Sequence, residues 1–248
     1  MSYSIQIENL RKHYPGAENT ALQGLSLNFK KGIIAGLLGP NGAGKTTTIS
    51  IICGLVKADS GLAKVLELDC SNDIIEIKKK IGVVPQQFAL YPQLTGKENL
   101  EYVGRLYNIP SKSLKGKVSE MLAHFGLEKH ANKRVSQYSG GMKRRANIIA
   151  GLLHNPELLI LDEPTAGVDV QSRNMILDFL KQYNVQGNTI IYTSHLLEEA
   201  EKICDDVAII DEGKLIAQAS PKQLIASAEG CNSLEDVFLF YTGRTVRE

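Results

Sequence analysis

The sequence predicts one α/β domain over residues 1–248, built on a parallel sheet with a lobe of helices inserted between two strands. Three observations support this fold class. A continuous apolar run at 33–38 leads through a glycine-rich turn into a helix-like segment, as at the start of a βαβ unit. Further apolar runs at 158–161 and 189–193 alternate with helical patterns. Residues from about 88 to 151 show apolar spacings of three and four, which indicates helices.

Two strands that each expose one face are expected near the N-terminus, at 5–10 and 25–29, because apolar and polar residues alternate there. A turn-rich segment, 13–19, separates them. The run at 33–38 lacks this alternation, which predicts a strand buried on both faces. A helix is expected to follow over about 45–54.

The C-terminal part predicts an alternation of helices and strands. The expected elements are two helices and a buried strand, at about 171–183, 196–203 and 207–210. The turn signal Asp211-Glu212-Gly213 precedes a short apolar segment, so a terminal hairpin is expected. A short helical tail is expected within about 219–248.

Composition excludes several classes of protein. The 28 basic and 27 acidic side chains nearly cancel to a net charge of +1, so no global basic field attracts nucleic acid. No stretch approaches the roughly 20 apolar residues of a membrane-spanning helix, and no secretory signal opens the chain, so we expect a soluble chain. The widely spaced cysteines predict reduced structural thiols: Cys53, Cys70, Cys204 and Cys231.

The strongest motif is Gly39-Pro40-Asn41-Gly42-Ala43-Gly44-Lys45-Thr46, which matches GxxxxGK[ST] between a buried strand and a helix. Glycines let the backbone curl so that successive N–H groups point at phosphate oxygens, and the helix N-terminus adds positive charge. Lys45 is expected to neutralise the β- and γ-phosphates, and the Thr46 hydroxyl to ligate magnesium. The competing interpretation is an ordinary glycine-rich turn.

An acidic pair, Asp162-Glu163, follows the apolar run at 158–161. It should lie at the carboxyl edge of the parallel sheet, where ligands bind in open α/β folds. A carboxylate at Asp162 suits magnesium, which prefers oxygen ligands. Glu163 is the candidate to orient an attacking water for phosphoryl transfer. The alternative is an acidic turn without chemistry.

A second anion site is suggested by Ser139-Gly140-Gly141-Met142-Lys143. Serine is a favoured N-cap, the two glycines expose backbone N–H groups, and a helical pattern follows. A plain capped helix explains the same residues equally well, so this interpretation stays open at this point.

Taken together, these motifs resemble the nucleotide-binding subunits of ATP-binding cassette (ABC) transporters, over roughly residues 5–213. Ser139-Gly140-Gly141-Met142 is similar to the family's signature motif, with Tyr138 and Met142 in place of the commoner leucine and glutamine. The resemblance implies a P-loop NTPase cassette: a RecA-like core, an N-terminal antiparallel β subdomain and an inserted α-helical subdomain. It also implies that ATP and Mg²⁺ are bound.

Family roles carry over to matching positions as expectations. The implied ATP-binding residues are Tyr14, Gly39, Pro40, Asn41, Gly42, Ala43, Gly44, Lys45, Thr46 and Thr47. The implied magnesium ligands are Thr46, Gln86 and Asp162, and the implied catalytic residues are Glu163, His195 and Gln86. Tyr14 would stack on adenine and His195 would contact the γ-phosphate, although a turn tyrosine and a structural histidine are the alternatives. Asp169 would lie in a loop that crosses a dimer interface.

The resemblance further implies an assembly. The signature helix would cap ATP held by a second nucleotide-binding subunit, in a homodimer or a heterodimer. The apolar stretch 88–92 would dock a separate integral-membrane permease, or else belongs to the core of the helical lobe. The chain would then act at the cytoplasmic face of a bacterial cell membrane. The tail, including Thr242-Gly243-Arg244, resembles cassettes that export drugs, lipids or polysaccharides; the alternative is a regulatory or soluble non-transport ABC ATPase.

Overall fold

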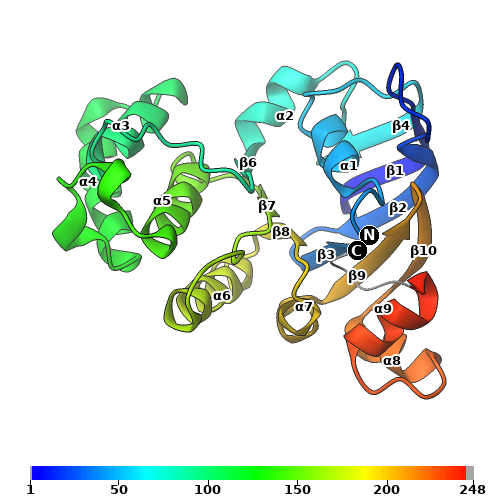
Figure 1. Ribbon diagram of the computed structural model, residues 1–248. Coiled ribbons are helices and arrows are strands. Elements are labelled where there is room, and N and C mark those ends of the chain that lie inside the picture. The colour runs from blue at the N-terminus through cyan, green and yellow to red at the C-terminus, as the bar shows by residue number, and fades with distance from the viewer. Residues whose placement is uncertain (1, 244–248) are drawn as a thin grey trace.

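Within residues 2–243, which the computed structural model describes, the central sheet has six strands in the order β10-β9-β3-β8-β7-β6 (Figure 1). All run parallel except β10, which pairs antiparallel with β9. The strands are β3 (Ile34–Leu38), β6 (Ile81–Val84), β7 (Leu158–Asp162), β8 (Thr189–Thr193), β9 (Asp206–Asp211) and β10 (Lys214–Ala219). The predicted α/β fold class is confirmed, and so is the terminal hairpin.

The central sheet separates two hydrophobic cores. Every residue of β3 and β8 is buried, as the absence of alternation predicted. Successive side chains of a strand point to opposite faces. Leu37 therefore packs into the core beneath the antiparallel sheet, and Leu38 into the core that continues into the helical lobe.

The second sheet is antiparallel, in the order β2-β1-β4-β5. Its strands are β1 (Tyr3–Lys12), β2 (Leu22–Lys30), β4 (Ser60–Val65) and β5 (Leu68–Asp69). β1 and β2 confirm the two predicted N-terminal strands and extend beyond both. The sequence interpretation did not anticipate β4 and β5, nor the short strand β6 of the central sheet.

Helices alone occupy the described chain between residues 85 and 157, apart from loops and one isolated bridge (green in Figure 1). They are α3 (Gly96–Leu106), α4 (Ser111–His124) and α5 (Gly140–Leu152), with two short 3₁₀ turns between α4 and α5. α3 opens with a capping box, in which Thr95 and Glu98 satisfy each other's backbone N–H groups. α3 and α4 pack closely because Gly104 has no side chain; a Cβ there would lie 2.2 Å from Leu114 Cδ1.

The remaining helices flank the two sheets (Figure 1). They are α1 (Lys45–Ile52), α2 (Ile74–Lys80), α6 (Val170–Val185), α7 (Leu197–Ile203), α8 (Pro221–Ser227) and α9 (Leu234–Thr242). Predicted and observed ends differ by up to two residues for α1, α6 and α7. The predicted helical tail is formed by α8 and α9, and Arg244 of the tail motif lies outside the described residues.

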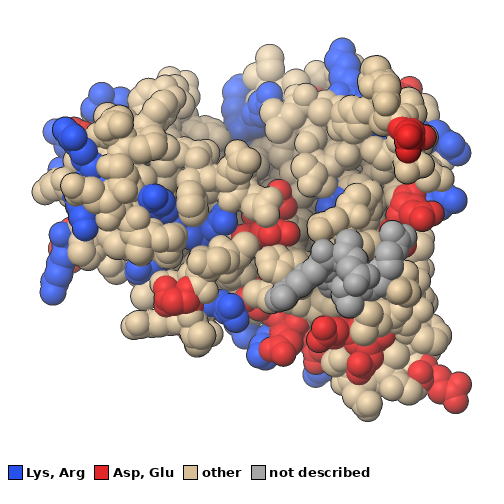
Figure 2. Space-filling model, in the orientation of Figure 1, with Lys and Arg blue, Asp and Glu red and all other residues tan. Residues whose placement is uncertain are grey.

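Charge is distributed unevenly despite the near-zero total. On the face in Figure 2, basic side chains are frequent over the helical lobe, whereas acidic side chains gather around α7 and α9. Across residues 2–243, none of the helices combines the length and apolar character needed to cross a membrane. The four cysteines are free thiols, in agreement with the prediction.

Candidate functional site

The glycine-rich loop lies tightly between β3 and α1. A Cβ on Gly39 would lie 2.3 Å from the carbonyl oxygen of Ile210 on β9, and one on Gly44 would lie 2.8 Å from that of Ala21. Gly44 also has a φ of 105°, which favours glycine. α1 begins at Lys45, as predicted, with no acidic side chain in its first turn. The loop therefore directs the positive end of a helix towards the edge of the sheet.

Lys45 folds back over this loop. Its Nζ donates to the carbonyl oxygens of Gly39 at 2.6 Å and Pro40 at 2.9 Å. Burial lowers the pKa of the Lys45 ammonium, and the nearby carboxylates of Glu163 and Asp162 oppose that effect in part. A partly desolvated cation held in this way is suited to an anion that approaches the loop.

Asp162 ends β7 and Glu163 follows it with a φ of 48°, a left-handed conformation that is uncommon for glutamate. The Thr193 hydroxyl, at the end of β8, links the two residues. It donates to Asp162 Oδ1 at 2.7 Å and accepts from the backbone N–H of Glu163 at 3.1 Å. The sequence interpretation missed Thr193, because a threonine in a strand is unremarkable without knowledge of its neighbours.

The carboxylate of Glu163 lies between two polar side chains. Its Oε2 accepts a hydrogen bond from Gln86 Nε2 at 2.8 Å and lies 3.2 Å from His195 Nδ1. Gln86 follows β6, Glu163 follows β7 and His195 follows β8, and these strands are neighbours in the sheet. Parallel strands bring their carboxyl ends to one edge. The three residues predicted to be catalytic are therefore brought together.

A cavity of about 330 Å³ joins the glycine-rich loop to the acidic pair. Its lining residues are Ala21, Asn41, Gly42, Ala43, Gly44, Lys45, Thr46, Thr47, Gln86, Asp162 and Glu163. Ala21 was not predicted. Tyr14, His195 and the signature residues are not among these lining residues. Tyr14 lies in the turn after β1 with its side chain 36% exposed, and the Lys12 ammonium is 5.6 Å from its ring centroid.

The signature motif and Asp169 pack against each other outside that cavity. Ser139 caps α5, as predicted, by accepting a hydrogen bond from the N–H of Met142 at 3.2 Å. Asp169 caps α6 by accepting from the N–H of Ser172 at 2.9 Å, and this bond holds the pKa of Asp169 below its usual value. A Cβ on Gly141 would lie 3.1 Å from Asp169 Oδ2. Within one chain, the predicted second anion site thus borders the Asp169 loop.

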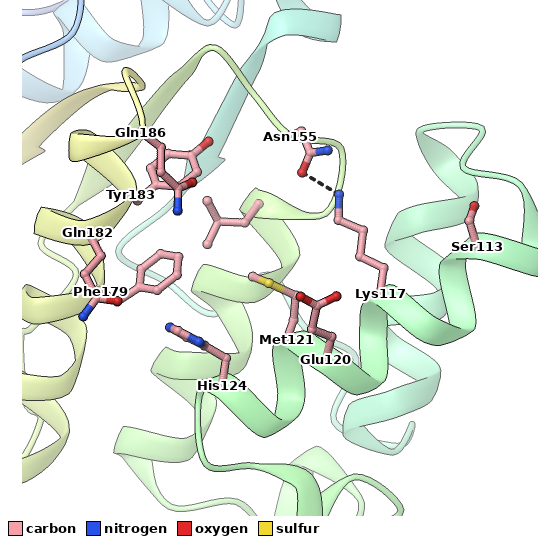
Figure 3. Close-up of a pocket in the computed structure, with 11 residues that line it drawn as sticks. Ser113, Lys117, Glu120, Met121, His124, Asn155, Phe179, Gln182, Tyr183 and Gln186 are labelled. Carbon is pink, nitrogen blue, oxygen red and sulfur yellow. Dashed lines mark hydrogen bonds between the residues drawn. The ribbon is translucent and has the colours of Figure 1, made fainter.

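A larger cavity of about 550 Å³ lies between α4 and α6 (Figure 3). Phe179, Tyr183 and Met121 contribute apolar surface, and Lys117 donates a 2.5 Å hydrogen bond to Asn155 across its rim. None of the predicted site residues lines it. The glycine-rich loop and the acidic pair make the smaller cavity the candidate site.

Comparison with known proteins shows the family to which this chain is related. The ABC transporter family matches residues 22–166. The linearmycin resistance ATP-binding protein LnrL of Bacillus subtilis is 48% identical over 226 residues, or 91% of this chain and 72% of that protein. The Nod factor export ATP-binding protein I of Ralstonia nicotianae is 38% identical over 231 residues, or 93% of this chain and 71% of that protein.

Two solved structures show the same fold. The cassette MJ0796, in a dimeric post-hydrolysis state with ADP and Pi, has a TM-score of 0.80 and 28% identity, covering 87% of this chain and 98% of that one. CbiO1 of Clostridium perfringens, part of an ABC transporter complex, has a TM-score of 0.81 and 29% identity, covering 91% and 92%. From the site and these relationships together, we conclude that the chain belongs to the ABC transporter family, as an ATP-binding and ATP-hydrolysing cassette subunit.

Proposed function

We propose that this cassette hydrolyses Mg²⁺-bound ATP as one of a head-to-tail pair and thereby powers export through a separate membrane permease. The observation that carries the proposal is the single cavity at the sheet edge that unites the Lys45 loop with Asp162 and Glu163. Phosphoryl transfer depends on positioning and charge, and this cavity supplies a cation, backbone donors and a carboxylate in one place.

The geometry supports the following proposed roles. The loop N–H groups and Lys45 bind the β- and γ-phosphates, whose negative charge compensates the desolvated ammonium. Glu163 accepts a hydrogen bond from the attacking water and orients it. Gln86 and His195 contact the same oxygen of Glu163 from the two neighbouring strands, so they set the direction of its carboxylate.

The residues present fit a magnesium ion. Thr46, Gln86 and Asp162 line one cavity and offer a hydroxyl, an amide and a carboxylate oxygen, which are the hard ligands that this cation prefers. When bound, Mg²⁺ would neutralise charge on the phosphates. The hydroxyl of Thr193 orients Asp162 from behind.

A second cassette would complete each site. Ser139 and Gly141 do not line the cavity of their own chain, although their helix N-terminus is suited to a phosphate. Head-to-tail pairing of two cassettes, as homodimer or heterodimer, would place this N-terminus over the partner's ATP. The dimeric state of the similar cassette MJ0796 supports such pairing.

An exposed aromatic surface favours a permease partner. Phe88 is 43% exposed, Tyr91 is 53% exposed, and Tyr91 makes an edge-to-face contact with the exposed ring of Tyr102. This surface begins two residues after Gln86, so a docked membrane protein would act directly on the site. The cassette would then lie at the cytoplasmic face of the bacterial membrane. The names of the relatives, linearmycin resistance and Nod factor export, support export of a drug, lipid or polysaccharide.

The first test is Glu163→Gln, measured by phosphate release and by ATP titration. We expect ATP binding to persist and turnover to fall by about 10²–10⁴-fold, the usual effect of losing a general base. Glu198→Gln is the matched control, because that carboxylate is 82% exposed on α7. Unchanged turnover in Glu163→Gln would remove Glu163 from its proposed role.

The pairing of two cassettes through the signature motif is tested by a substitution at Gly140 rather than at Gly141. A Cβ on Gly141 would lie 2.8 Å from Ser172 Oγ within the same chain, whereas one on Gly140 meets only the carbonyl oxygen of Gly167 at 3.7 Å. Gly140→Asp should keep ATP binding but lose hydrolysis and ATP-dependent dimerisation. Gly140→Asn adds a side chain of similar size without the charge, so it separates the effect of size from that of charge. Normal hydrolysis by Gly140→Asp would contradict pairing through the signature.

Export is tested in inside-out vesicles from cells that express the chain with its permease. We expect ATP-dependent uptake of linearmycin, the compound named for the most similar relative described above. The same vesicles with Lys45→Met provide the control. Uptake that is equal in the two preparations would argue against powered export of this compound.

A further inference from the structure

Glu199 is a buried carboxylate that the roles above do not use. It lies on α7, four residues after His195, and is only 4% exposed. Burying a carboxylate is costly unless its oxygens are paired. The partners of Glu199 therefore indicate what this charge holds in place.

One oxygen of Glu199 accepts hydrogen bonds from two hydroxyl groups. Thr165 Oγ1 donates to Oε2 at 2.5 Å, and the Tyr192 hydroxyl donates to the same atom. Burial, and then the charge of Glu199, hold the pKa of Tyr192 well above its usual value, so its hydroxyl stays protonated and remains a donor. The two hydroxyl oxygens are themselves 3.3 Å apart.

The second oxygen faces a cation. Arg173 Nε lies 3.1 Å from Glu199 Oε1. Neither atom has a directed hydrogen-bond partner within the described chain, so this is an ion contact rather than a hydrogen bond. Arg173 belongs to the first turn of α6, whose N-cap is Asp169.

Two of these partners lie close in sequence to Glu163 or to the threonine that supports it. Thr165 follows Glu163 by two residues. Tyr192 directly precedes Thr193, the residue that links Asp162 to Glu163. Glu199 itself lies on the helix that follows His195. The Glu199 carboxylate thus connects the loop that carries Glu163 with the loop that carries His195, and these two residues lie 3.2 Å apart.

We propose that Glu199 is a positioning residue for ATP hydrolysis, which fixes the relative placement of Glu163 and His195 through Thr165, Tyr192 and Arg173. The inference rests on the proposed function of Glu163. A purely structural carboxylate would affect folding alone. A positioning carboxylate lowers turnover in protein that is folded and binds ATP normally.

Glu199→Gln is the informative variant. Its amide oxygen still accepts from both hydroxyl groups, but its NH₂ group meets the donor of Arg173, so the anchor loosens with little change in volume. We expect kcat to fall by about tenfold while KM for ATP and the ATP dissociation constant stay within about twofold. Arg173→Met removes the other partner and should have a similar effect.

Glu201→Gln is the matched control on the same helix. Glu201 accepts a hydrogen bond from the N–H of Leu234 at 2.9 Å, so it holds the tail rather than the site. We expect that variant to lower the melting temperature and to leave kcat unchanged. Should Glu199→Gln fail to fold, Tyr192→Phe keeps the ring, removes one donor and should lower kcat severalfold.

These experiments distinguish a failure of the positioning role from a failure of the proposed function. Folded Glu199→Gln with wild-type kcat, or with a raised KM alone, would overturn the positioning role while leaving the function intact. A wild-type chain that releases no phosphate with its partner present, or that loses nothing in Glu163→Gln, would overturn the proposed function itself.

Discussion

Replacing Gly39 by alanine tests whether the glycine-rich loop depends on close packing against β9. The added Cβ would lie 2.3 Å from the carbonyl oxygen of Ile210 and 2.9 Å from Ala43 Cβ. Ordinary contacts begin near 3.5 Å, so one side must move by about 1 Å. Ile210 is fully buried in β9, a strand paired on both edges, and it has little room to move. The loop is therefore expected to shift.

The size of the effect follows from this displacement. An extra methyl group forced into a packed interior costs about 1–3 kcal/mol, which exceeds the roughly 0.8 kcal/mol gained by burying one methyl-sized group. We expect Gly39→Ala to lower the free energy of unfolding by about 1–2 kcal/mol. ATP affinity should fall as well, because Gly39 carries the carbonyl oxygen that holds Lys45 Nζ at 2.6 Å.

Urea denaturation and titration with MgATP measure the two effects separately. Gly116→Ala in α4 is the control, since a Cβ there meets nothing within 4 Å and the backbone is helical. It should stabilise the protein by about 0.5–1 kcal/mol and leave ATP binding unchanged. If Gly39→Ala matched the wild-type stability and ATP affinity, the packing argument for this loop would be wrong.

Substitutions at three predicted site residues give further tests. Lys45→Met should abolish ATP binding in titration calorimetry without lowering the melting temperature, because burial already disfavours the charge there; wild-type affinity would contradict the phosphate role. Tyr14→Ala should weaken ATP binding by about tenfold, since a base–aromatic stack contributes about 1–3 kcal/mol, whereas Tyr14→Phe should bind normally. Asp169→Asn keeps the cap but removes the charge. The folded pKa of Asp169 lies below its unfolded value, so the charge stabilises the fold only where the carboxyl is ionised. The urea midpoints of the variant and the wild type should therefore differ at pH 7 and converge as the pH falls below about 4.

Local patterns were sufficient to predict the strands that are buried along their whole length. β3 is an apolar run that leads into a glycine-rich turn, and β8 is a short segment of apolar and β-branched residues; these patterns identified both strands. β4 and β6 escaped notice for a physical reason. Ser60–Val65 contains two polar residues and a glycine, and Ile81–Val84 is only four residues long, so pairing with β1 and β7 rather than propensity makes them strands.

The residues of the candidate site likewise fall into those that the local sequence predicts and those that it does not. The glycine-rich loop and the acidic pair were predictable, because their chemistry is written in consecutive residues. Thr193 and Glu199 were not, since each acts by contacts with segments up to 34 positions away, and nothing in its immediate neighbours marks it. The roles of Gln86 and His195 came from the resemblance; the structure adds that both contact the same oxygen of Glu163.

The two contacts at Glu163 Oε2 suggest how docking of a partner would affect hydrolysis. Glu163 Oε2 accepts a hydrogen bond from Gln86, which follows one neighbouring strand, and lies beside His195, which follows the other, so a change in either contact would turn the carboxylate that orients the water. Gln86 is the residue better placed to move, because it leads directly into the exposed aromatic segment at Phe88 and Tyr91. His195, by contrast, precedes α7, a helix that is anchored by the contacts of its own residue Glu199. We therefore expect displacement of the helical lobe by a docked partner to release Glu163 on its Gln86 side, which would link docking to hydrolysis through one hydrogen bond.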